Sequence, residues 1–296
     1  MSAKRLVALV SGFGWHVQDL RRASVGLGID LSAIPFSELS ARVGGSVSAI
    51  EGRGIPLAGV DGVLVRMMPP GSLEQVVFRM DALHRLVALG VPVMNSPGAV
   101  EASVDKYLTL AKLDADRLPV PRTWVGESAK AALAAFDELG RDVVVKPLFG
   151  SEGRGLVRVT DLEVARRVFH ALERIGAVLY VQQFIPNRGY DLRAFVLGNR
   201  VLGAIRRHAP AGDWRTNVSV GGSAEVVRLD LETESLALRA AEAVGARMAG
   251  VDLLPDRDGK LVVLEVNAVP GWRALSAATG VDVASEILAD LRDARR

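Results

Sequence analysis

The chain has 296 residues, of which 49% are apolar, and its 36 basic and 34 acidic side chains leave a formal charge of +2. The apolar content excludes a disordered chain, and the near-zero charge gives no broad electrostatic footprint for nucleic acid. Because the sequence has no cysteine, disulfides, thiolate metal sites and a cysteine nucleophile are excluded.

The first hundred residues predict a parallel sheet with helices outside it. Three short apolar runs predict buried strands: Leu6–Val10, Val63–Arg66 and Val91–Met94. The stretch Leu73–Leu89 has apolar residues at helical spacing, with Ser72 as the expected N-cap and Gly90 as the expected C-cap. The glycines of Gly12–Gly14 indicate a simple turn after the first strand.

The rest of the chain predicts an α+β arrangement with antiparallel sheets. A short helix, Val104–Leu113, ends before the prolines at 119 and 121. The predicted strands then come in hairpin-like pairs: Val143–Lys146 with Leu156–Val159, next Leu179–Ile185, and Leu192–Leu197 with Arg200–Ile205. Two further helices are predicted: Leu162–Ile175, with Leu162, Val168, Phe169, Leu172 and Ile175 on one face, and Glu232–Met248.

A glycine-rich loop, Gly150–Gly155, follows a strand that ends in Lys146. Backbone N–H groups in such a loop allow a phosphate to approach closely, and the lysine adds a point charge. No helix and no Gly-Lys-Ser/Thr follow, so this is neither a Walker A loop nor a Rossmann turn. The alternative is a glycine-rich hairpin with a surface lysine.

Two carboxylates and one amide are expected to converge on a later hairpin. Asp258-Gly259 predicts a two-residue type I′ turn, and counting outward from it places Asp252 opposite Glu265. Asn267 lies on the same face as Glu265, since strands have a period of two. Oxygen ligands in otherwise apolar strands predict a Mg²⁺ site, because unpaired carboxylates would be costly there. The alternative is a pair of carboxylates bridged to arginine.

The strand Leu179–Ile185 ends at Pro186, where its backbone groups could read the edge of an adenine. Downstream lie charged and amide side chains that could clamp carboxylates or phosphates: Asp191, Arg193, Arg206, Arg207, Arg215 and Asn217. Taken singly, each arginine is better explained as a surface residue, but together, around a phosphate loop and a metal hairpin, they indicate a site.

The order of these motifs resembles that of the ATP-grasp ligases, and more narrowly the RimK-like α-L-glutamate ligase group. The resembling stretches are Val104–Tyr107, Leu118–Pro121, Val145–Leu148, Gly150–Gly155, Gln183–Ile185, Asp191–Arg193, Arg215–Asn217, Gly250–Asp252 and Glu265–Asn267. In place of the His-Arg pair of RimK the chain has Ser219-Val220. Its segment Ala268–Leu275 is more similar to ligases linked to pterin and furan C1-carrier cofactors.

The resemblance implies a role for each matching residue. The nucleotide site would comprise Lys106, Lys146, Gly150, Ser151, Gly153, Gly155, Gln183, Phe184, Ile185, Asp191 and Arg193. The ligands of Mg²⁺, with Mn²⁺ as an alternative, would be Asp252, Glu265 and Asn267. The groups around the γ-phosphate and the acceptor would be Arg207, Arg215 and Asn217.

The resemblance also implies a fold and a reaction. The fold combines α/β and α+β parts: a parallel-sheet domain (1–100), a small subdomain with the glycine-rich loop (101–186) and a subdomain with the Mg²⁺ site (187–296), with ATP between the last two. In the reaction, a carboxylate attacks the γ-phosphate of ATP to give an acylphosphate, and an amine then displaces the phosphate. The expected product is an amide of L-glutamate with a carboxylate acceptor such as a C1-carrier cofactor precursor.

Alternative functions are a RimK- or LysX-like ligase acting on the C-terminus of a protein or carrier protein, and a non-catalytic ATP-binding regulator. The expected partners are a small amino acid and a carboxylate acceptor, with no nucleic acid and no membrane, and we expect a homo-oligomer. No apolar run reaches about 18 residues, and Leu6–Val10 is too short for a signal-peptide core, so a cytoplasmic location is expected.

Overall fold

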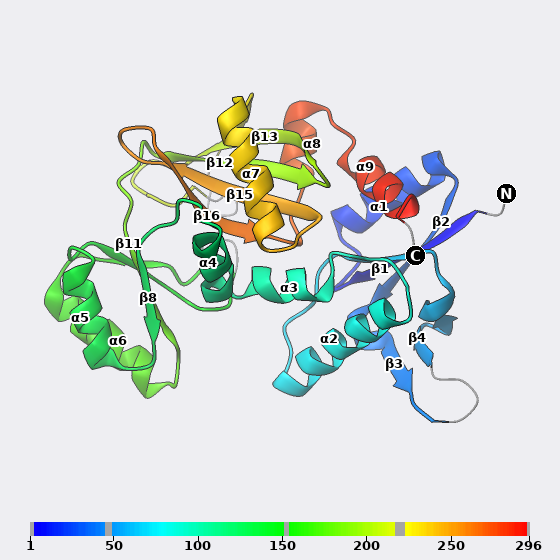
Figure 1. The fold of residues 1–296 in the computed structure, drawn as a ribbon, viewed down its shortest axis with the longest axis horizontal. Coiled ribbons are helices and arrows are strands. Elements are labelled where there is room, and N and C mark those ends of the chain that lie inside the picture. Colours follow the sequence, from blue (N-terminus) through cyan, green and yellow to red (C-terminus); the bar gives the residue numbers. More distant parts are fainter. Residues whose placement is uncertain (1–2, 45–48, 151–153, 217–222, 295–296) are drawn as a thin grey trace.

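The computed structural model describes residues 3–44, 49–150, 154–216 and 223–294. Figure 1 shows three regions along the longest axis: a parallel sheet at one end, a five-stranded sheet in the middle and a four-stranded sheet at the other end. The expected combination of α/β and α+β parts is confirmed. Within the described ranges, no helix has the length and apolarity needed to span a membrane.

The N-terminal sheet is parallel, as predicted, with the strand order β2-β1-β6-β7. Its strands are β1 (Lys4–Val10), β2 (Ile29–Pro35), β6 (Gly62–Val65) and β7 (Val93–Met94). Its helices are α1 (Trp15–Leu27) and α2 (Leu73–Ala88). Alternate residues of β1 join different cores, Leu6 on the α1 side and Val7 on the α2 side. Burial on both faces explains why this strand is a continuous apolar run.

The sequence did not predict several elements of this region. Helix α1 and strand β2 follow directly after β1, and the predicted turn Gly12–Gly14 leads into the helix. A small antiparallel sheet comprises β3 (Leu39–Arg42), β4 (Ala49–Gly52) and β5 (Ile55–Pro56), and the short 3-10 helices are η1 (Phe36–Glu38) and η2 (Leu57–Gly59).

The predicted N-cap of α2 is confirmed, whereas the predicted C-cap is wrong by one residue. Ser72 caps the helix through a reciprocal pair of hydrogen bonds with Gln75. The C-cap is Leu89 rather than Gly90, which follows with a φ of +77°. Glycine suits that position because it adopts left-handed angles without a Cβ penalty.

The helix predicted over Val104–Leu113 is wrong at its start. The chain forms two helices, α3 (Pro97–Val104) and α4 (Lys106–Ala115), separated by one residue. That residue, Asp105, accepts hydrogen bonds from the N–H groups of Tyr107 (2.8 Å) and Leu108 (3.0 Å). An aspartate N-cap ends one helix and begins the next, and it places Lys106 in the first turn of α4.

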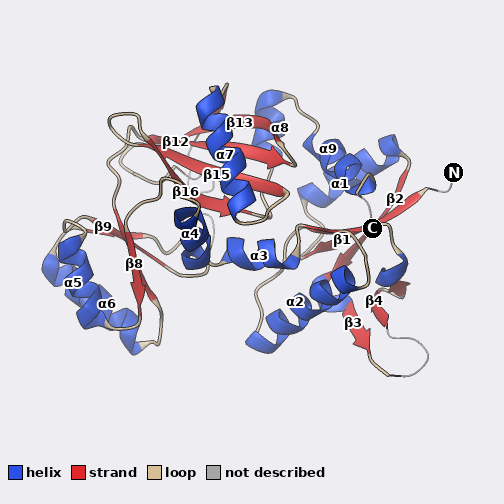
Figure 2. Ribbon diagram, viewed as in Figure 1, coloured by secondary structure: helices blue, strands red, loops and turns tan. Residues whose placement is uncertain are grey.

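The four-stranded sheet is antiparallel, with the order β10-β9-β11-β8. Its strands are β8 (Thr123–Gly126), β9 (Val143–Lys146), β10 (Val157–Val159) and β11 (Leu179–Gln183), and its helices are α5 (Ala129–Glu138) and α6 (Leu162–Arg174). Figure 2 shows both helices on one side of this sheet. Phe169 of α6 is buried there, but Ile175 caps the helix end and is 76% exposed, so it does not belong to the predicted apolar face.

The five-stranded sheet is antiparallel, with the order β14-β13-β12-β15-β16. Its strands are β12 (Tyr190–Leu197), β13 (Arg200–His208), β14 (Ser223–Val227), β15 (Met248–Pro255) and β16 (Leu261–Asn267). Helix α7 (Leu231–Ala243) packs on this sheet. The prediction carried this helix on to Met248, which instead begins β15. The helix ends earlier because Gly245 takes a φ of +71°.

The β15–β16 hairpin places Asp252 opposite Glu265, as predicted, although the predicted turn is wrong. The Asp256 N–H donates to the Lys260 carbonyl (2.9 Å), so three residues rather than two close the loop. That turn shifts the register by one residue, and a β-bulge at Leu264 shifts it back before Glu265. The bulge brings Glu265 to the face of Asp252, because a one-residue slip turns a side chain to the opposite face.

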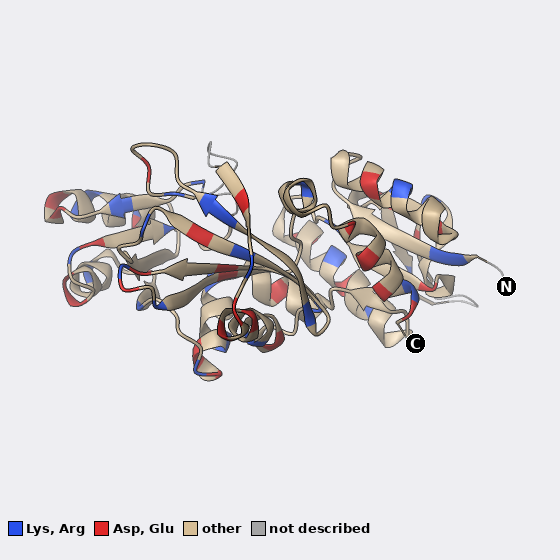
Figure 3. Ribbon diagram, turned by 90° about the horizontal axis from the view of Figure 1, so that it is seen from above, with Lys and Arg blue, Asp and Glu red and all other residues tan. Residues whose placement is uncertain are grey.

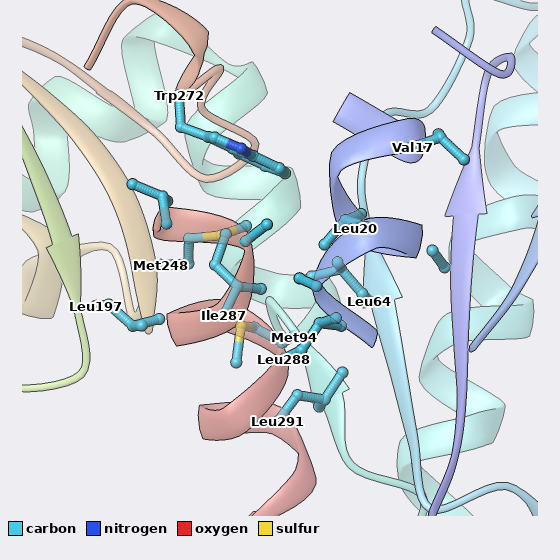
Figure 4. Close-up of a cluster of buried hydrophobic side chains, with 14 of the residues drawn as sticks. Val17, Leu20, Leu64, Met94, Leu197, Met248, Trp272, Ile287, Leu288 and Leu291 are labelled. Atoms are coloured by element: carbon cyan, nitrogen blue, oxygen red, sulfur yellow. The ribbon is translucent and has the colours of Figure 1, made fainter. Parts of the chain in front are cut away.

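The chain returns to the N-terminal sheet through α8 (Arg273–Thr279) and α9 (Val283–Arg292). Figure 4 shows α9 side chains such as Leu288 between Leu20 of α1 and Met248 of β15, with Trp272 above them. Asn95 reinforces this junction, because its side-chain amide donates to the carbonyls of Met248 and Ala268, both at 2.6 Å. The N-terminal and C-terminal parts therefore share one apolar core.

Candidate active site

A cleft lies between the four-stranded and five-stranded sheets, and it contains most of the predicted site residues. The predicted residues that line it are Lys106, Lys146, Gly150, Gln183, Phe184, Ile185, Asp191, Arg207, Arg215, Asp252 and Glu265. Three others, Gly155, Arg193 and Asn267, lie outside the lining. Ser151, Gly153 and Asn217 lie outside the described residues.

Two lysines enter the cleft from different elements. Lys146, at the end of β9, donates to Oε1 of Gln182 (2.6 Å), and Lys106, in the first turn of α4, donates to the Gly150 carbonyl (2.7 Å). Burial lowers the pKa of Lys146 to about 8, against the effect of the nearby Glu265 carboxylate. Burial also lowers the pKa of Lys106, and Glu265 again acts in the opposite direction. Both ammonium groups therefore lie near the same carboxylate.

The two ends of the glycine-rich loop lie close to Pro147. A Cβ at Gly150 would come within 3.3 Å of the Pro147 ring, and one at Gly155 within 3.4 Å. Both residues also have positive φ angles, +152° and +74°. Glycine is therefore required at both positions by the backbone itself.

The predicted adenine-binding residues differ in how their backbone groups are used. The Gln183 N–H donates to the Arg122 carbonyl and the Phe184 N–H to the Asp142 carbonyl, both at 2.9 Å. Among the described residues, no partner is found for the Ile185 N–H, which leaves it for a ligand. The Phe184 ring is held between the Arg158 guanidinium, 3.6 Å from the ring centre, and Trp214.

Asp252 and Glu265 face each other across β15 and β16, yet their surroundings differ. Arg193 binds both oxygens of Asp252 (2.7 and 2.8 Å), and Arg207 approaches one of them at 2.9 Å. Burial alone would raise the pKa of Asp252, but the charges of Arg193 and Arg207 outweigh it, and the pKa lies below its usual value. The arginine-bridged alternative therefore describes Asp252.

Glu265 has no such partner. With the described residues it forms neither an ion pair nor a hydrogen bond. Burial raises its pKa, and the neighbouring Asp252 carboxylate raises it further. The charges of Arg193, Lys106 and Lys146 only partly offset these effects. A carboxylate without a direct ion pair in such a place is costly, and a bound cation would stabilise its charged form.

Asp191 and Arg207 form a buried network with Asp252. Arg207 is 3% exposed and donates its Nε to Asp191 Oδ1 (2.7 Å). The hydroxyl of Thr216 donates to the other oxygen of Asp191 at 2.6 Å. Burial alone would lower the pKa of Arg207, but Asp252 and Asp191 raise it above its usual range. Arg207 is thus fully engaged by carboxylates, whereas Arg215 pairs with the more exposed Asp213.

The donor set fits a polyanion with a divalent cation. The charged residues of the lining are five cationic side chains, Lys106, Lys146, Arg154, Arg207 and Arg215, and three carboxylates, Asp191, Asp252 and Glu265. The described residues contain no group of three or more His, Cys, Asp and Glu placed to hold a metal. The predicted set has two carboxylates and the amide of Asn267, whose Oδ1 accepts the Val269 N–H (2.8 Å). In Figure 3 both signs of charge are interspersed along the molecule.

Other lining residues were not predicted as site residues. They are Val144, Arg154, Leu156, Gln182, Asn187, Trp214, Thr216, Leu254 and Leu264. Gln182 left a signal in the sequence, since a polar residue within the apolar run of β11 needs a partner, and it binds Lys146. Trp214 and Thr216 flank the predicted Arg215. The aliphatic members look like ordinary strand core, and the sequence holds no signal that separates them from it.

The chain is similar to known proteins along most of its length. A model of the RimK-like ATP-grasp domain matches residues 103–291. A tetrahydromethanopterin:alpha-L-glutamate ligase of Methanosarcina acetivorans is 34% identical, over 95% of this chain and 91% of that protein. A probable alpha-L-glutamate ligase 2 of Shewanella denitrificans is 31% identical, over 93% and 90%. The ATP-grasp ligase PsnB, in complex with minimal precursor, Mg and ADP, has the same fold, with a TM-score of 0.74 and 24% identity over 97% and 96% of the two chains.

Proposed function

Because the chain belongs to the RimK-like ATP-grasp family, whose members are carboxylate–amine ligases, we propose that it joins the amino group of L-glutamate to a carboxylate of a C1-carrier cofactor precursor. The family uses ATP and Mg²⁺. A relative that spans nearly the whole chain is named for tetrahydromethanopterin and L-glutamate, which supports this substrate pair. The reaction forms an amide and releases ADP and phosphate.

The observation that carries the proposal is the arrangement of two lysines around an unpaired carboxylate. Lys106 and Lys146 both lie near Glu265, which forms no direct ion pair with the described residues, and Asp252 lies opposite it. A triphosphate needs cationic side chains, and a divalent cation needs carboxylate oxygens. This cleft supplies both within one site.

The nucleotide would lie between the two sheets. Lys106, Lys146 and the loop Gly150–Gly155 would bind its phosphates, and the free Ile185 N–H would read the adenine edge. Aliphatic residues on both walls, among them Val144 and Leu254, would enclose the base. Asp191 would hold the Arg207 guanidinium in place, and Arg193 would hold the Asp252 carboxylate in place. Neither residue then needs to contact the nucleotide directly.

Glu265, Asp252 and Asn267 would hold Mg²⁺, or Mn²⁺ in its place. When bound, the ion neutralises the charge that develops on the transferring phosphoryl group. Phosphoryl transfer depends on alignment and charge neutralisation more than on a covalent protein group. Arg207 is occupied by Asp191 and Asp252, so we assign Arg215 to the oxyanion formed when the amine attacks the acylphosphate.

The function is tested by measuring ADP release with ATP, Mg²⁺, L-glutamate and tetrahydromethanopterin. We expect release to require all components, and mass spectrometry to show one or more glutamyl groups on the acceptor. Replacement of the pterin by peptide or carrier-protein C-termini tests the protein-directed alternative. ADP release with no acceptor and no amino acid, or none under any combination, would contradict the proposal.

Lys146→Ala is expected to raise the ATP KM or lower kcat by about tenfold or more, because a charge on the phosphates is lost. Lys146→Arg should be impaired as well, since a planar guanidinium does not reproduce the compact ammonium that donates to Gln182. The control is Lys112→Arg at the exposed end of α4, which should behave as wild type. Steady-state kinetics with varied ATP measure the effect, and an unchanged ATP dependence in Lys146→Ala would reject the phosphate role.

Three further expectations accompany this proposal. We propose the division into 1–100, 101–186 and 187–296, with helix α9 of the last part packed against α1 of the first. Assembly into a homo-oligomer and a cytoplasmic location stay predictions from the sequence. Light scattering would measure the oligomeric state. Fractionation of cells that produce the protein would measure its location.

A further inference from the structure

Arg66 is a buried guanidinium without a carboxylate partner. It follows β6 and is 3% exposed, and among the described residues no acidic side chain pairs with it. Its Nη1 donates to the Val269 carbonyl (3.0 Å), but its Nε finds no hydrogen-bond partner in the part of the chain that the structure describes. Burial lowers the pKa of Arg66 to about 10, so the group is still charged at neutral pH. A buried charge in this state calls for an anion.

The start of helix α1 lies at the same edge of the N-terminal sheet. The Arg66 N–H donates to the Leu9 carbonyl (2.9 Å), so Arg66 lies beside the end of β1, from which the chain runs into α1. The N-cap of α1 is Gly14, and no side chain caps the helix. A Cβ on Gly12 or Gly14 would meet nothing within 4 Å. Packing and the φ angles of these two glycines therefore do not require glycine, and the space above them is open to a ligand.

Trp272 brings His16 of α1 and Arg66 together. The Arg66 guanidinium lies 4.8 Å from the centre of the Trp272 ring, and the His16 ring lies 4.6 Å from it. The Trp272 backbone N–H donates to His16 Nε2 (3.3 Å), so in the neutral ring the proton is on Nδ1. Burial and the charges of Arg66 and Arg273 lower the pKa of His16 to about 4, against the effect of the Asp19 carboxylate, which keeps the ring neutral. Nδ1–H is then a further donor without a partner among the described residues.

This edge of the sheet is connected to the cleft by a short segment. Val269, whose carbonyl binds Arg66, is two residues beyond Asn267 and donates its own N–H to the Asn267 side chain. The Arg66 guanidinium is therefore held by the segment that directly follows β16, the strand that carries Glu265 and Asn267. The lysines that would bind the nucleotide phosphates come from different elements, α4 and β9.

We propose that Arg66, the first turn of α1 and His16 form a binding site for a carboxylate of an organic substrate. The inference rests on the proposed ligase function, in which both the amino acid and the acceptor carry carboxylates. A guanidinium fork matches a carboxylate better than an ammonium does, because it offers two parallel N–H donors. The site orients one substrate for attack and leaves its bound carboxylate unreacted.

The kinetic test separates this role from a purely structural one. In Arg66→Gln we expect the KM of either L-glutamate or the pterin acceptor to rise about tenfold or more, with the ATP KM within about twofold of wild type. The substrate whose KM rises is the one whose carboxylate is bound. Arg66→Lys keeps the charge and a donor for the Val269 carbonyl, so it should restore thermal stability but not the KM.

The matched control is Leu288→Ala, which loosens the same domain junction without touching the guanidinium. If Arg66→Gln alters the kinetics only as this control does, or leaves both KM values unchanged, the proposal is overturned. The proposal is also overturned if the KM of Arg66→Lys equals the wild-type value.

A binding test without ATP keeps the inference separate from the ligase reaction. L-Glutamate and glutarate are added to the wild-type protein, and thermal unfolding is followed. We expect at least one of the two to raise the Tm of wild type and of Leu288→Ala but not of Arg66→Gln. A Tm rise that persists in Arg66→Gln, or no rise in wild type with either probe, contradicts the site even if ADP release is observed.

Discussion

Replacing Glu265 with alanine is expected to abolish ATP turnover while the chain still folds. The loss should reach about three orders of magnitude, because a bound metal ion contributes several kcal/mol of transition-state charge stabilisation. Folding should be unaffected or improved, since this buried carboxylate has no ion pair or hydrogen bond with the described residues and its pKa is raised by burial. ADP release in the presence of Mg²⁺ measures the first effect, and thermal unfolding measures the second.

The control is Asp258→Ala, at the exposed tip of the same hairpin, which should retain wild-type turnover. Glu265→Gln is a useful second variant because it keeps the shape of the side chain and removes its charge. Full turnover in Glu265→Ala would exclude this residue as a metal ligand. Loss of folding in both Glu265 variants would show that the carboxylate has an unrecognised structural role.

Replacing Arg207 with methionine should lower the free energy of unfolding by about 3–5 kcal/mol, as expected when one partner of a buried ion pair is removed. The substitution leaves Asp191 without its guanidinium and takes one of two arginines from Asp252. Denaturant unfolding followed by circular dichroism measures the change. Activity should fall as well, because Asp252 loses one of the groups that orient it.

Arg206→Met is the control for this change. Arg206 is the preceding residue of β13, and its guanidinium binds the exposed Glu225, so its loss should cost about 1 kcal/mol or less. Adding Asp191→Asn to Arg207→Met removes one of the carboxylates left without its arginine and should recover part of the lost stability. An Arg207→Met protein as stable as wild type would contradict the importance of the network.

The hairpin shows how a correct site prediction came from an incomplete argument. The pairing of Asp252 with Glu265 was predicted from a two-residue turn, but the loop has three residues and a bulge at Leu264 compensates. Turn residues are a strong local signal, whereas a bulge depends on packing against neighbouring strands and leaves little trace in the sequence.

Helix ends were predicted well where a local cap decides them and poorly where it does not. Ser72 and Gln75 form a reciprocal cap that a short stretch of sequence encodes. The boundary between α3 and α4 depends on Asp105 as a cap within a continuous helical pattern, and the pattern hid it. Helix α1 was missed because its apolar residues pack against α9, which comes about 260 residues later.

The sequence by itself determined the strands on either side of the glycine-rich loop and the acidic hairpin, because each depends on neighbouring residues and on strand periodicity. Only the tertiary structure decided which charged groups are paired. Arg207 and Arg193 lie against Asp252, Glu265 forms no ion pair with any described residue, and Arg66 is buried at the junction of distant segments. The physical reason is that an ion pair depends on distance and burial, and these arise when residues far apart in the chain pack together.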